Sequence, residues 1–269
     1  MATDAFDLKW GQELAAKIGP QIKTEISRIR KSPPLVPLVQ SSARFEGVVP
    51  DYRVDPGPPA RIKPSARLIP VKISSEFVLS QEQFTDEMLA AHLALRPAAD
   101  LAYAEDAILL HGSRADTYLK GLNIRDENST LSEQHGLFEA APKPLPPGKS
   151  ITDSIREGLE KLQKQLQHGP YCVIVSPDLH RDAITPNGTS TTPKIAPILP
   201  ELRESGFRFS EAAPERTGVI FSIGGGALDM YIPWDVHVEC RKVEGSATFV
   251  VVEQFRLRIN DPRALATLS

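Results

Sequence analysis

Apolar and polar residues alternate near the C-terminal end of the chain, and this pattern predicts two strands joined by a turn. Residues 236–240 alternate strictly between apolar and polar side chains, a period of two that is typical of a strand with one covered face. Gly245-Ser246 supplies the turn. Residues 249–259 then place five large apolar side chains on one face. Val250 and Val252 point to the other face, so we expect part of this strand to be covered on both sides.

One acidic residue interrupts the apolar side of the second strand. Glu253 occupies an apolar position between Val251 and Phe255. A carboxylate on a covered face needs a partner, because an unpaired buried charge is costly. We therefore interpret Glu253 as a structural acid at an interface. We expect an arginine opposite it, across a sheet or a subunit boundary.

Residues 6–31 have the periodicity of an amphipathic helix. Gly19-Pro20 interrupts this segment, and proline inside a helix predicts a kink or a division into two helices. The apolar stripe has two readings. It is either an ordinary core-facing stripe or part of a surface groove for a partner peptide. Its members recur every three or four residues and are Leu14, Ile18, Ile22, Ile26 and Ile29.

Residues 33–72 have a different character from the rest of the chain. They contain nine prolines and few large apolar groups, and residues 44–72 carry six basic residues against three acidic ones. Ordering a residue costs roughly 1–2 kcal/mol in backbone entropy, which this segment cannot offset by burying its own surface. A structureless loop of this length is unusual inside a compact domain. We therefore expect the segment either to remain flexible or to lie along another subunit.

The chain between the proline-rich segment and residue 149 predicts one strand and two helices. Residues 71–79 resemble a strand, and residues 84–95 a short helix. Pro97 is suited to the first turn of a second helix, which Gly112 ends. Residues 113–149 are expected to be loop-like.

Residues 150–222 predict an α/β subdomain, because helical and strand patterns alternate there. Ser150 is a suitable N-cap, with Asp153 three positions later in a pattern close to a capping box. Residues 171–175 form a short apolar strand, and Ser176-Pro177-Asp178 favours the start of another helix. A polar loop, a short helix and a strand are expected at residues 187–193, 197–204 and 219–223.

Composition favours a globular protein with no large charged surface for nucleic acid or an anionic membrane. The chain has 269 residues, a net charge of −3 and 41% hydrophobic residues, which are ordinary values. No apolar run approaches the ~20 residues of a membrane span, and the first residues lack the pattern of a signal peptide. Cys172 and Cys240 have no metal-site or redox spacing. We expect two reduced core thiols in a cytoplasmic protein.

Two patterns resemble ligand or phosphate sites but lack the required context. Asp178, His180 and Asp182 are alternate residues on a predicted helix, so their side chains point in different directions and cannot share a metal ion. Gly224-Gly225-Gly226 lacks the Lys-Ser/Thr of a phosphate loop and precedes a strand. We interpret the first set as surface residues and the second as a strand corner.

Acidic residues near the end of the second helix offer another candidate site. Glu105-Asp106 beside His111 could form an acid/base set. At the end of an apolar helix, however, such residues more often form ion pairs or caps. Neither cysteine has an identifiable cationic pocket with a partner histidine, so neither is expected to be a nucleophile. We therefore predict no catalytic residue and no metal site.

Short segments spread over residues 68–268 resemble the encapsulins, the shell proteins of bacterial and archaeal compartments with the major-capsid fold of tailed phages. Each segment is modest alone, but their order and spacing match the family. They are Leu68-Ile69-Pro70, Phe77-Val78-Leu79, Ala104-Glu105-Asp106 through Gly112, Lys120-Gly121-Leu122, Gly169-Pro170-Tyr171, Val175-Ser176-Pro177 with Leu179, Leu228-Asp229, Asp235, Val252-Glu253-Gln254-Phe255 through Arg258-Ile259, Pro262 to Ala264, and Leu268.

The resemblance implies an α+β, capsid-like fold with an extended loop that lies against a neighbouring subunit. The peripheral domain would combine a long helix with a β-sheet, and the axial domain would be α/β. The implied divisions are an N-terminal lumen-facing helix at 1–32, the extended loop at 33–72, a peripheral domain at 73–112, an axial domain at 113–222, and the C-terminal strands of the peripheral domain at 223–269.

The resemblance also implies where partners bind. The N-terminal helix and the C-terminal strands would form the groove for the targeting peptide of a cargo enzyme, with Ile22, Ile26 and Ile29 as candidate residues. The loop facing the fivefold pore would contain Asn187, Gly188, Thr189, Ser190, Thr191 and Thr192. Some relatives bind a flavin beside a tryptophan after the strand that ends here at Leu79. This chain has Gln81 and Gln83 there, so no cofactor is expected.

Together these inferences predict a self-assembling icosahedral shell in the cytoplasm, enclosing a cargo enzyme such as a peroxidase or a ferritin-like protein. Closed rotation axes with repeated heterologous contacts can generate such a shell. Its pores would admit small molecules or ions, and the chain itself would not be an enzyme. One alternative is a phage or prophage-derived capsid protein that encloses DNA. A remote alternative is an α/β hydrolase using Ser176, His180 and Asp182, although the chain lacks a GxSxG motif.

Overall fold

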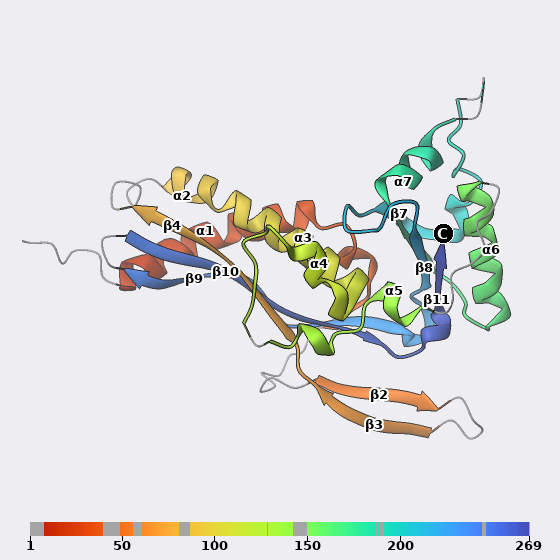
Figure 1. The fold of residues 1–269 in the computed structure, drawn as a ribbon, viewed down its shortest axis with the longest axis horizontal. Coiled ribbons are helices and arrows are strands. Elements are labelled where there is room, and N and C mark those ends of the chain that lie inside the picture. The colour runs from red at the N-terminus through yellow and green to blue at the C-terminus, as the bar shows by residue number, and fades with distance from the viewer. Residues whose placement is uncertain are drawn as a thin grey trace, which may run out of the picture.

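The computed structural model describes residues 8–39, 49–55, 61–80, 87–127, 129–141, 150–186, 188, 191–243 and 246–268. These residues form two packed sheets with helices, and a hairpin that projects from them (Figure 1). Mixed helices and strands arranged in this way confirm the expected α+β class.

The larger sheet is built around the long antiparallel pair predicted from the C-terminal alternation. Its strands, in spatial order, are β1 (Leu38–Val39), β9 (Leu228–Val243), β10 (Ser246–Ile259), β4 (Val71–Ser80) and β5 (Arg125–Asp126). β10 is antiparallel to both β9 and β4, so its side chains have neighbours on both sides. Val250 and Val252 are also buried, as the apolar residues on both faces of this strand predicted.

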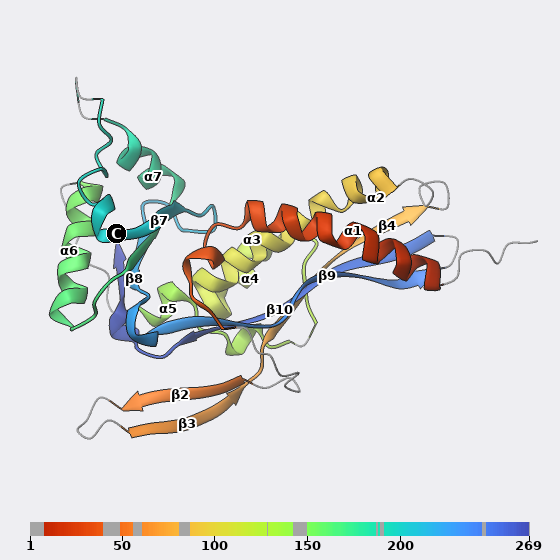
Figure 2. The ribbon, with the colours of Figure 1, turned by 180° about the vertical axis from the view of Figure 1, so that it is seen from behind.

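Helices α1 (Leu8–Ile29), α2 (Glu87–Leu93) and α3 (Leu95–His111) lie on one side of this sheet, as Figures 1 and 2 show from opposite directions. α1 passes through Pro20 as one helix, so of the two alternatives predicted at Gly19-Pro20, the division into two helices is wrong and the kink stays a prediction. Ile18 and Ile22 are both buried in the same core. Packing on each side of Pro20 therefore holds the two halves together.

The smaller sheet contains β11 (Leu265–Leu268), β8 (Gly218–Ser222), β6 (Tyr171–Val175) and β7 (Leu202–Phe209), in that order. Helices α6 (Ile151–Lys164) and α7 (Pro177–Ile184) pack beside this sheet. At the start of α6, the Asp153 amide donates to Ser150 Oγ at 3.2 Å, as the capping pattern predicted. The helix expected at 197–204 is wrong, because only a 3₁₀ turn at Leu199–Glu201 forms before the chain pairs with β6 as β7.

β6 has one core on each of its faces. Cys172 and Ile174 belong to the core shared with α1 and α3. Tyr171, Val173 and Val175 belong to a second core with α6. This explains why the strand is apolar at every position instead of alternating.

Residues 112–141 connect the two sheets and contain more structure than the expected loop. Gly112 (φ 55°) and Gly136 bring two backbone segments together so closely that a Cβ on Gly112 would lie 2.3 Å from Gly136 N. Only glycine fits such an approach. The short elements are η3 (Gly112–Arg114), α4 (Asp116–Leu119), β5, η4 (Leu131–Glu133) and α5 (Leu137–Ala140).

The proline-rich segment contains a β-hairpin, which the sequence analysis did not expect. β2 (Val49–Asp55) and β3 (Arg61–Leu68) pair antiparallel with each other and, among the described strands, with no other. In Figures 1 and 2 this hairpin lies away from both sheets. We call residues 49–68 the arm.

The described residues also contain three further 3₁₀ turns, η1 (Pro33–Leu35), η6 (Gly224–Gly226) and η7 (Pro262–Ala264). The glycine run is thus a corner leading into β9, as predicted. The division into five regions stays a prediction. Two strands cross its predicted boundaries. β11 belongs to the smaller sheet, although residues 223–269 were all assigned to the peripheral domain. β5 belongs to the larger sheet, although residues 113–222 were assigned to the axial domain.

Candidate functional site

The described residues contain no cluster of His, Cys, Asp and Glu that could hold a metal ion. The residues of the hydrolase alternative also face other partners. The His180 ring stacks on Phe207 with 5.2 Å between centroids, and Asp182 accepts a hydrogen bond from Lys194 Nζ at 2.5 Å. Ser176 is buried, and its side chain helps to lower the pKa of the neighbouring Asp178. These contacts do not form a nucleophile–base–acid arrangement.

A deeply buried polar site joins α1, α3 and β10. Arg30, directly after α1, donates from Nε to Glu105 Oε2 at 2.6 Å and from Nη2 to Glu253 Oε1. Both glutamate side chains are 0% exposed, and Arg30 is 12% exposed. The arginine expected opposite Glu253 is therefore found within the same chain, between a helix end and the sheet, and not across a subunit boundary.

Burial dominates the electrostatics of this site. Desolvation raises the pKa of Glu105 well above its usual value; the nearby Glu253 charge adds to the increase, and Arg30 opposes it. Desolvation likewise raises the pKa of Glu253 against the lowering effect of Arg30. A buried carboxyl favours its neutral form when the available cation cannot compensate fully.

The next residue on α3, Asp106, ties the same region to the smaller sheet. Its Oδ1 accepts from the Ser32 amide at 2.9 Å, and its Oδ2 accepts from Ser210 Oγ at 3.0 Å, just after β7. His111 turns elsewhere, with Nε2 2.6 Å from Ala212 O and its ring stacked on Tyr118. Glu105, Asp106 and His111 thus do not form an acid/base set. The interpretation as ion pairs or caps is confirmed for Glu105, which pairs with Arg30, whereas Asp106 and His111 make other hydrogen bonds.

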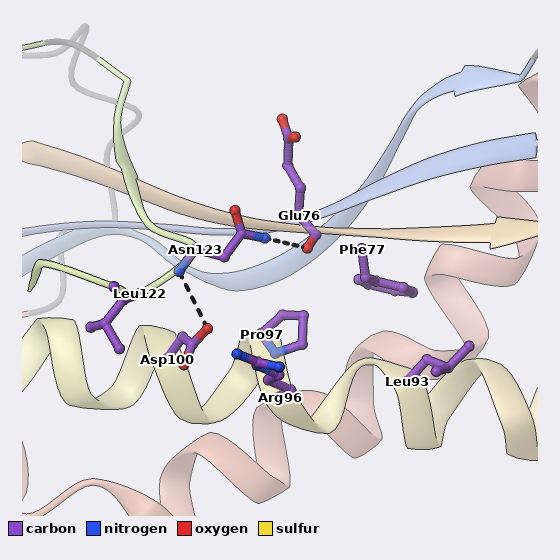
Figure 3. Close-up of a pocket in the computed structure, with 9 residues that line it drawn as sticks. Glu76, Phe77, Leu93, Arg96, Pro97, Asp100, Leu122 and Asn123 are labelled. Carbon is purple, nitrogen blue, oxygen red and sulfur yellow. Dashed lines mark hydrogen bonds between the residues drawn. The ribbon is translucent and has the colours of Figure 1, made fainter.

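A pocket of about 490 Å³ opens between β4 and the start of α3. Figure 3 shows Asn123 between the two, donating from Nδ2 to Glu76 O at 2.7 Å and from its amide to Asp100 Oδ2 at 3.4 Å. Among the described lining residues, Phe77 is the only aromatic one, and the others are Leu93, Arg96, Pro97, Gly121 and Leu122. The pocket is open and mixed in polarity. Gln81 and Gln83, on which the flavin argument depended, lie outside the described residues.

The residues predicted for peptide docking are placed mainly in the core. Ile22 and Ile26 are 1% and 0% exposed, and Ile29 packs against the same core from a partly buried position. The stripe of α1 is therefore covered by this chain itself, which supports the core-facing reading. In the predicted pore loop, Gly188, Thr191 and Thr192 are described, whereas Asn187, Thr189 and Ser190 lie outside the described residues.

Two exposed apolar side chains beside the larger sheet were missed by the sequence analysis. Leu38 on β1 is 52% exposed and Trp234 on β9 is 50% exposed. α1 lies along β9, and Lys23 of α1 is paired with Asp235 of β9. Trp234 has the same parity as the apolar positions Val236 and Val238, so the alternation placed it on the covered face and gave no signal of its exposure.

Comparison with known proteins identifies the class. The sequence profile of the Linocin_M18 family, described as "Encapsulating protein for peroxidase", matches residues 67–256. This match spans most of the chain and includes all of β9 and most of β10.

Solved structures agree on the fold. The virus-like particle of Pyrococcus furiosus superimposes with a TM-score of 0.69 at 15% identity, covering 94% of this chain and 98% of the other. The SrpI encapsulin complex of Synechococcus elongatus superimposes with a TM-score of 0.57 at 11% identity, covering 88% of this chain and 85% of the other. The capsid of Myoviridae phage XM1 superimposes with a TM-score of 0.54 at 11% identity, covering 87% of this chain and 89% of the other. At these identities the likeness shows the shared capsid fold and nothing finer.

The chain thus has the capsid fold that phage capsids and encapsulins share. Among proteins with this fold, the family match shows that the chain belongs to the encapsulins of the Linocin_M18 family. It is a shell protein that encloses cargo, a structural component and not an enzyme. No helix in the described part of the chain is long and apolar enough to cross a membrane.

Proposed function

We propose that copies of this chain assemble into a closed icosahedral shell in the cytoplasm that holds a cargo enzyme, and that the cargo is a peroxidase. The family description names a peroxidase as the enclosed protein, which supports this cargo over a ferritin-like one. The shell positions and separates the enzyme, and the turnover belongs to the cargo.

The observation that carries the assembly proposal is the arm. Its two strands pair only with each other among the described strands, and an isolated two-stranded hairpin is marginally stable in water. Each strand also leaves one edge of backbone donors and acceptors unpaired. Contact with neighbouring copies would supply the missing partners, and repetition around closed axes would complete a shell.

The cargo would dock through a short targeting peptide on the surface beside α1 and β9. Leu38 and Trp234 provide exposed apolar groups there, which can receive the apolar side chains of an extended peptide. Ile22 and Ile26 would contribute indirectly, by holding α1 in place. The loop containing residues 187–192 would line the fivefold pore and admit small molecules or ions.

Electron microscopy and sedimentation of the purified chain test assembly. We expect one large, uniform hollow particle, and a monomer or small oligomer at neutral pH would contradict the proposal. Protected DNA inside the particles would instead favour a phage-type capsid.

Co-expression with a peroxidase that carries its native C-terminal tail tests docking. Leu38→Asp should reduce cargo loading several-fold while shells still form. Leu199→Asp is the matched control, because Leu199 is 45% exposed beside the smaller sheet. Equal loading in both variants would contradict the proposed docking surface.

A further inference from the structure

One guanidinium serves two buried carboxylates at the end of α1. Arg30 Nε contacts Glu105 on α3, and Arg30 Nη2 contacts Glu253 on β10. Among the described residues, Arg30 is the only cation within ion-pair distance of either carboxylate. If both acids were ionised, the three side chains would carry a net charge of −1 in a site shielded from water.

Each acid also has one oxygen without a partner. Glu105 Oε1 and Glu253 Oε2 are buried and accept no hydrogen bond from any described group. A carboxylate can only accept hydrogen bonds, whereas a protonated carboxyl can also donate one. One added proton would therefore remove the excess charge and provide a donor where two acceptors are unsatisfied.

The surrounding charges do not supply the missing positive charge. Asp106, next to Glu105 on α3, is itself buried and is held by Ser32 and Ser210. From β9, Asp235 disfavours ionisation of Glu253, and His237 favours it more weakly. His237 Nε2 lies 2.9 Å from Glu239 and Asp235 is paired with Lys23, so both are already engaged at the surface.

We propose that Glu105 and Glu253 share one proton at neutral pH, and that the resulting neutral Arg30–Glu105–Glu253 cluster is a proton-binding site that fastens α1 to the larger sheet. Two strongly interacting carboxyls titrate as a pair, so the proton belongs to both. Loss of this proton places an uncompensated charge in the core and loosens the attachment of α1.

The position of the cluster explains why loosening it would affect the whole subunit. The segment that follows Arg30 leads directly to the smaller sheet, where the Leu35 carbonyl accepts from Arg203 Nη1 at 3.4 Å and from Cys172 Sγ at 3.8 Å. Glu105 and Asp106 are consecutive, so one turn of α3 fixes both the end of α1 and the loop after β7. The proton thus controls how firmly the two sheets are held in one orientation.

The sign of the pH dependence follows from the raised pKa values of these acids. The folded chain holds the proton more tightly than the unfolded chain, in which glutamate has a pKa near 4.5. Stability therefore falls as the pH rises from this value, until the folded pair has lost its proton. The folded cluster is strongest in acid and weakest in alkali.

Infrared spectroscopy of the intact protein tests the proton directly. At neutral pH the wild type should show the C=O stretch of a protonated, buried carboxylic acid. This band should be lost in Glu105→Gln and in Glu253→Gln, because the single remaining acid pairs with Arg30 as a carboxylate. It should persist in Glu13→Gln, which changes an exposed glutamate on α1. A band that is missing from the wild type, or that survives both cluster variants, overturns the proposal.

Alkaline titration of assembled particles, followed by light scattering and sedimentation, tests the consequence. Each single amide variant should shift the midpoint of shell loss upward by roughly one pH unit or more, because the amide imitates the neutral acid. The double variant Glu105→Gln/Glu253→Gln should be less stable than either single one, since Arg30 then lacks a counter-charge.

Unchanged midpoints in both single variants, or failure of both to assemble at neutral pH, would contradict the proposal. The particle measurement rests on the proposed shell function, whereas the infrared measurement does not. The two proposals can therefore fail separately.

Discussion

The larger sheet and the arm are both β-structures, but only the sheet completes its own core. β10 has a strand on each side, helices on one face and buried residues on both faces. The arm has two strands, each with one unpaired edge, and in the figures it lies away from the body of the subunit. Among the described residues, the larger sheet thus completes a core of its own, whereas the arm leaves strand edges unpaired.

This difference indicates how a shell subunit divides its stability. The sheet with α1 and α3 buries a large apolar core, whose hydrophobic contribution is available to a single copy. The arm can gain comparable contacts only in an assembly. Folding and assembly should therefore be separable by changes confined to one region.

Removal of the arm should have the largest effect. Val49 and Leu68 are directly opposite each other in the hairpin, so residues 50–67 can be replaced by Asn-Gly, which favours a two-residue turn. We expect this variant to retain near-native circular dichroism and to form no shells in sedimentation. Shells of normal size and yield would show that the arm is dispensable.

Arg30→Ala should cause the next largest effect, because it leaves two buried acids without their cation. Removing one partner of a buried ion pair costs about 3–5 kcal/mol, and the urea midpoint should fall accordingly. Arg28→Ala, on the same helix end, removes an exposed ion pair with Glu25 and should leave the midpoint unchanged. Equal midpoints for the two variants would show that the buried cluster contributes nothing specific.

Ile26→Ala tests whether the stripe of α1 belongs to the core. Ile26 is fully buried, and such a truncation costs about 2–5 kcal/mol through lost burial and a residual cavity. Leu199→Ala, at an exposed site, should cost far less. A loss below about 1 kcal/mol for Ile26→Ala, measured by urea unfolding, would argue that α1 detaches easily and exposes its stripe.

Gly19→Ala should give the smallest change, and in the opposite direction. A Cβ at Gly19 would meet nothing within 4 Å, and alanine is favoured over glycine inside a helix by about 0.5–1 kcal/mol. A slightly raised unfolding temperature is the expected result. A marked decrease would mean that α1 needs flexibility beside Pro20.

Much of the larger sheet and of the smaller subdomain could be predicted from local patterns. The alternation at residues 236–240 and 249–259 identified parts of β9 and β10, and the Ser150 cap identified the start of α6. Glu253 was recognisable as a buried acid because it broke the alternation. Its partner was not, since Arg30 lies 223 positions away and only tertiary packing brings the two together.

The arm could not be predicted because its prolines conceal the strand pattern. Pro50 and Pro64 lie within β2 and β3, and proline in a run normally argues against a strand. A two-stranded hairpin has only edge strands, however, so a missing amide can face away from the partner strand. The docking role of Ile22, Ile26 and Ile29 stays a prediction, because an amphipathic stripe has the same sequence pattern whether its own chain or a peptide covers it.

Hydrogen exchange of the arm amides in assembled shells and in dissociated subunits tests the central claim most directly. If neighbouring copies complete the arm, residues 49–55 and 61–68 should exchange slowly in the shell and rapidly in the free subunit, while β10 stays protected in both. Equal protection of the arm in the two states would contradict the account, because the arm would then be stable without any second copy.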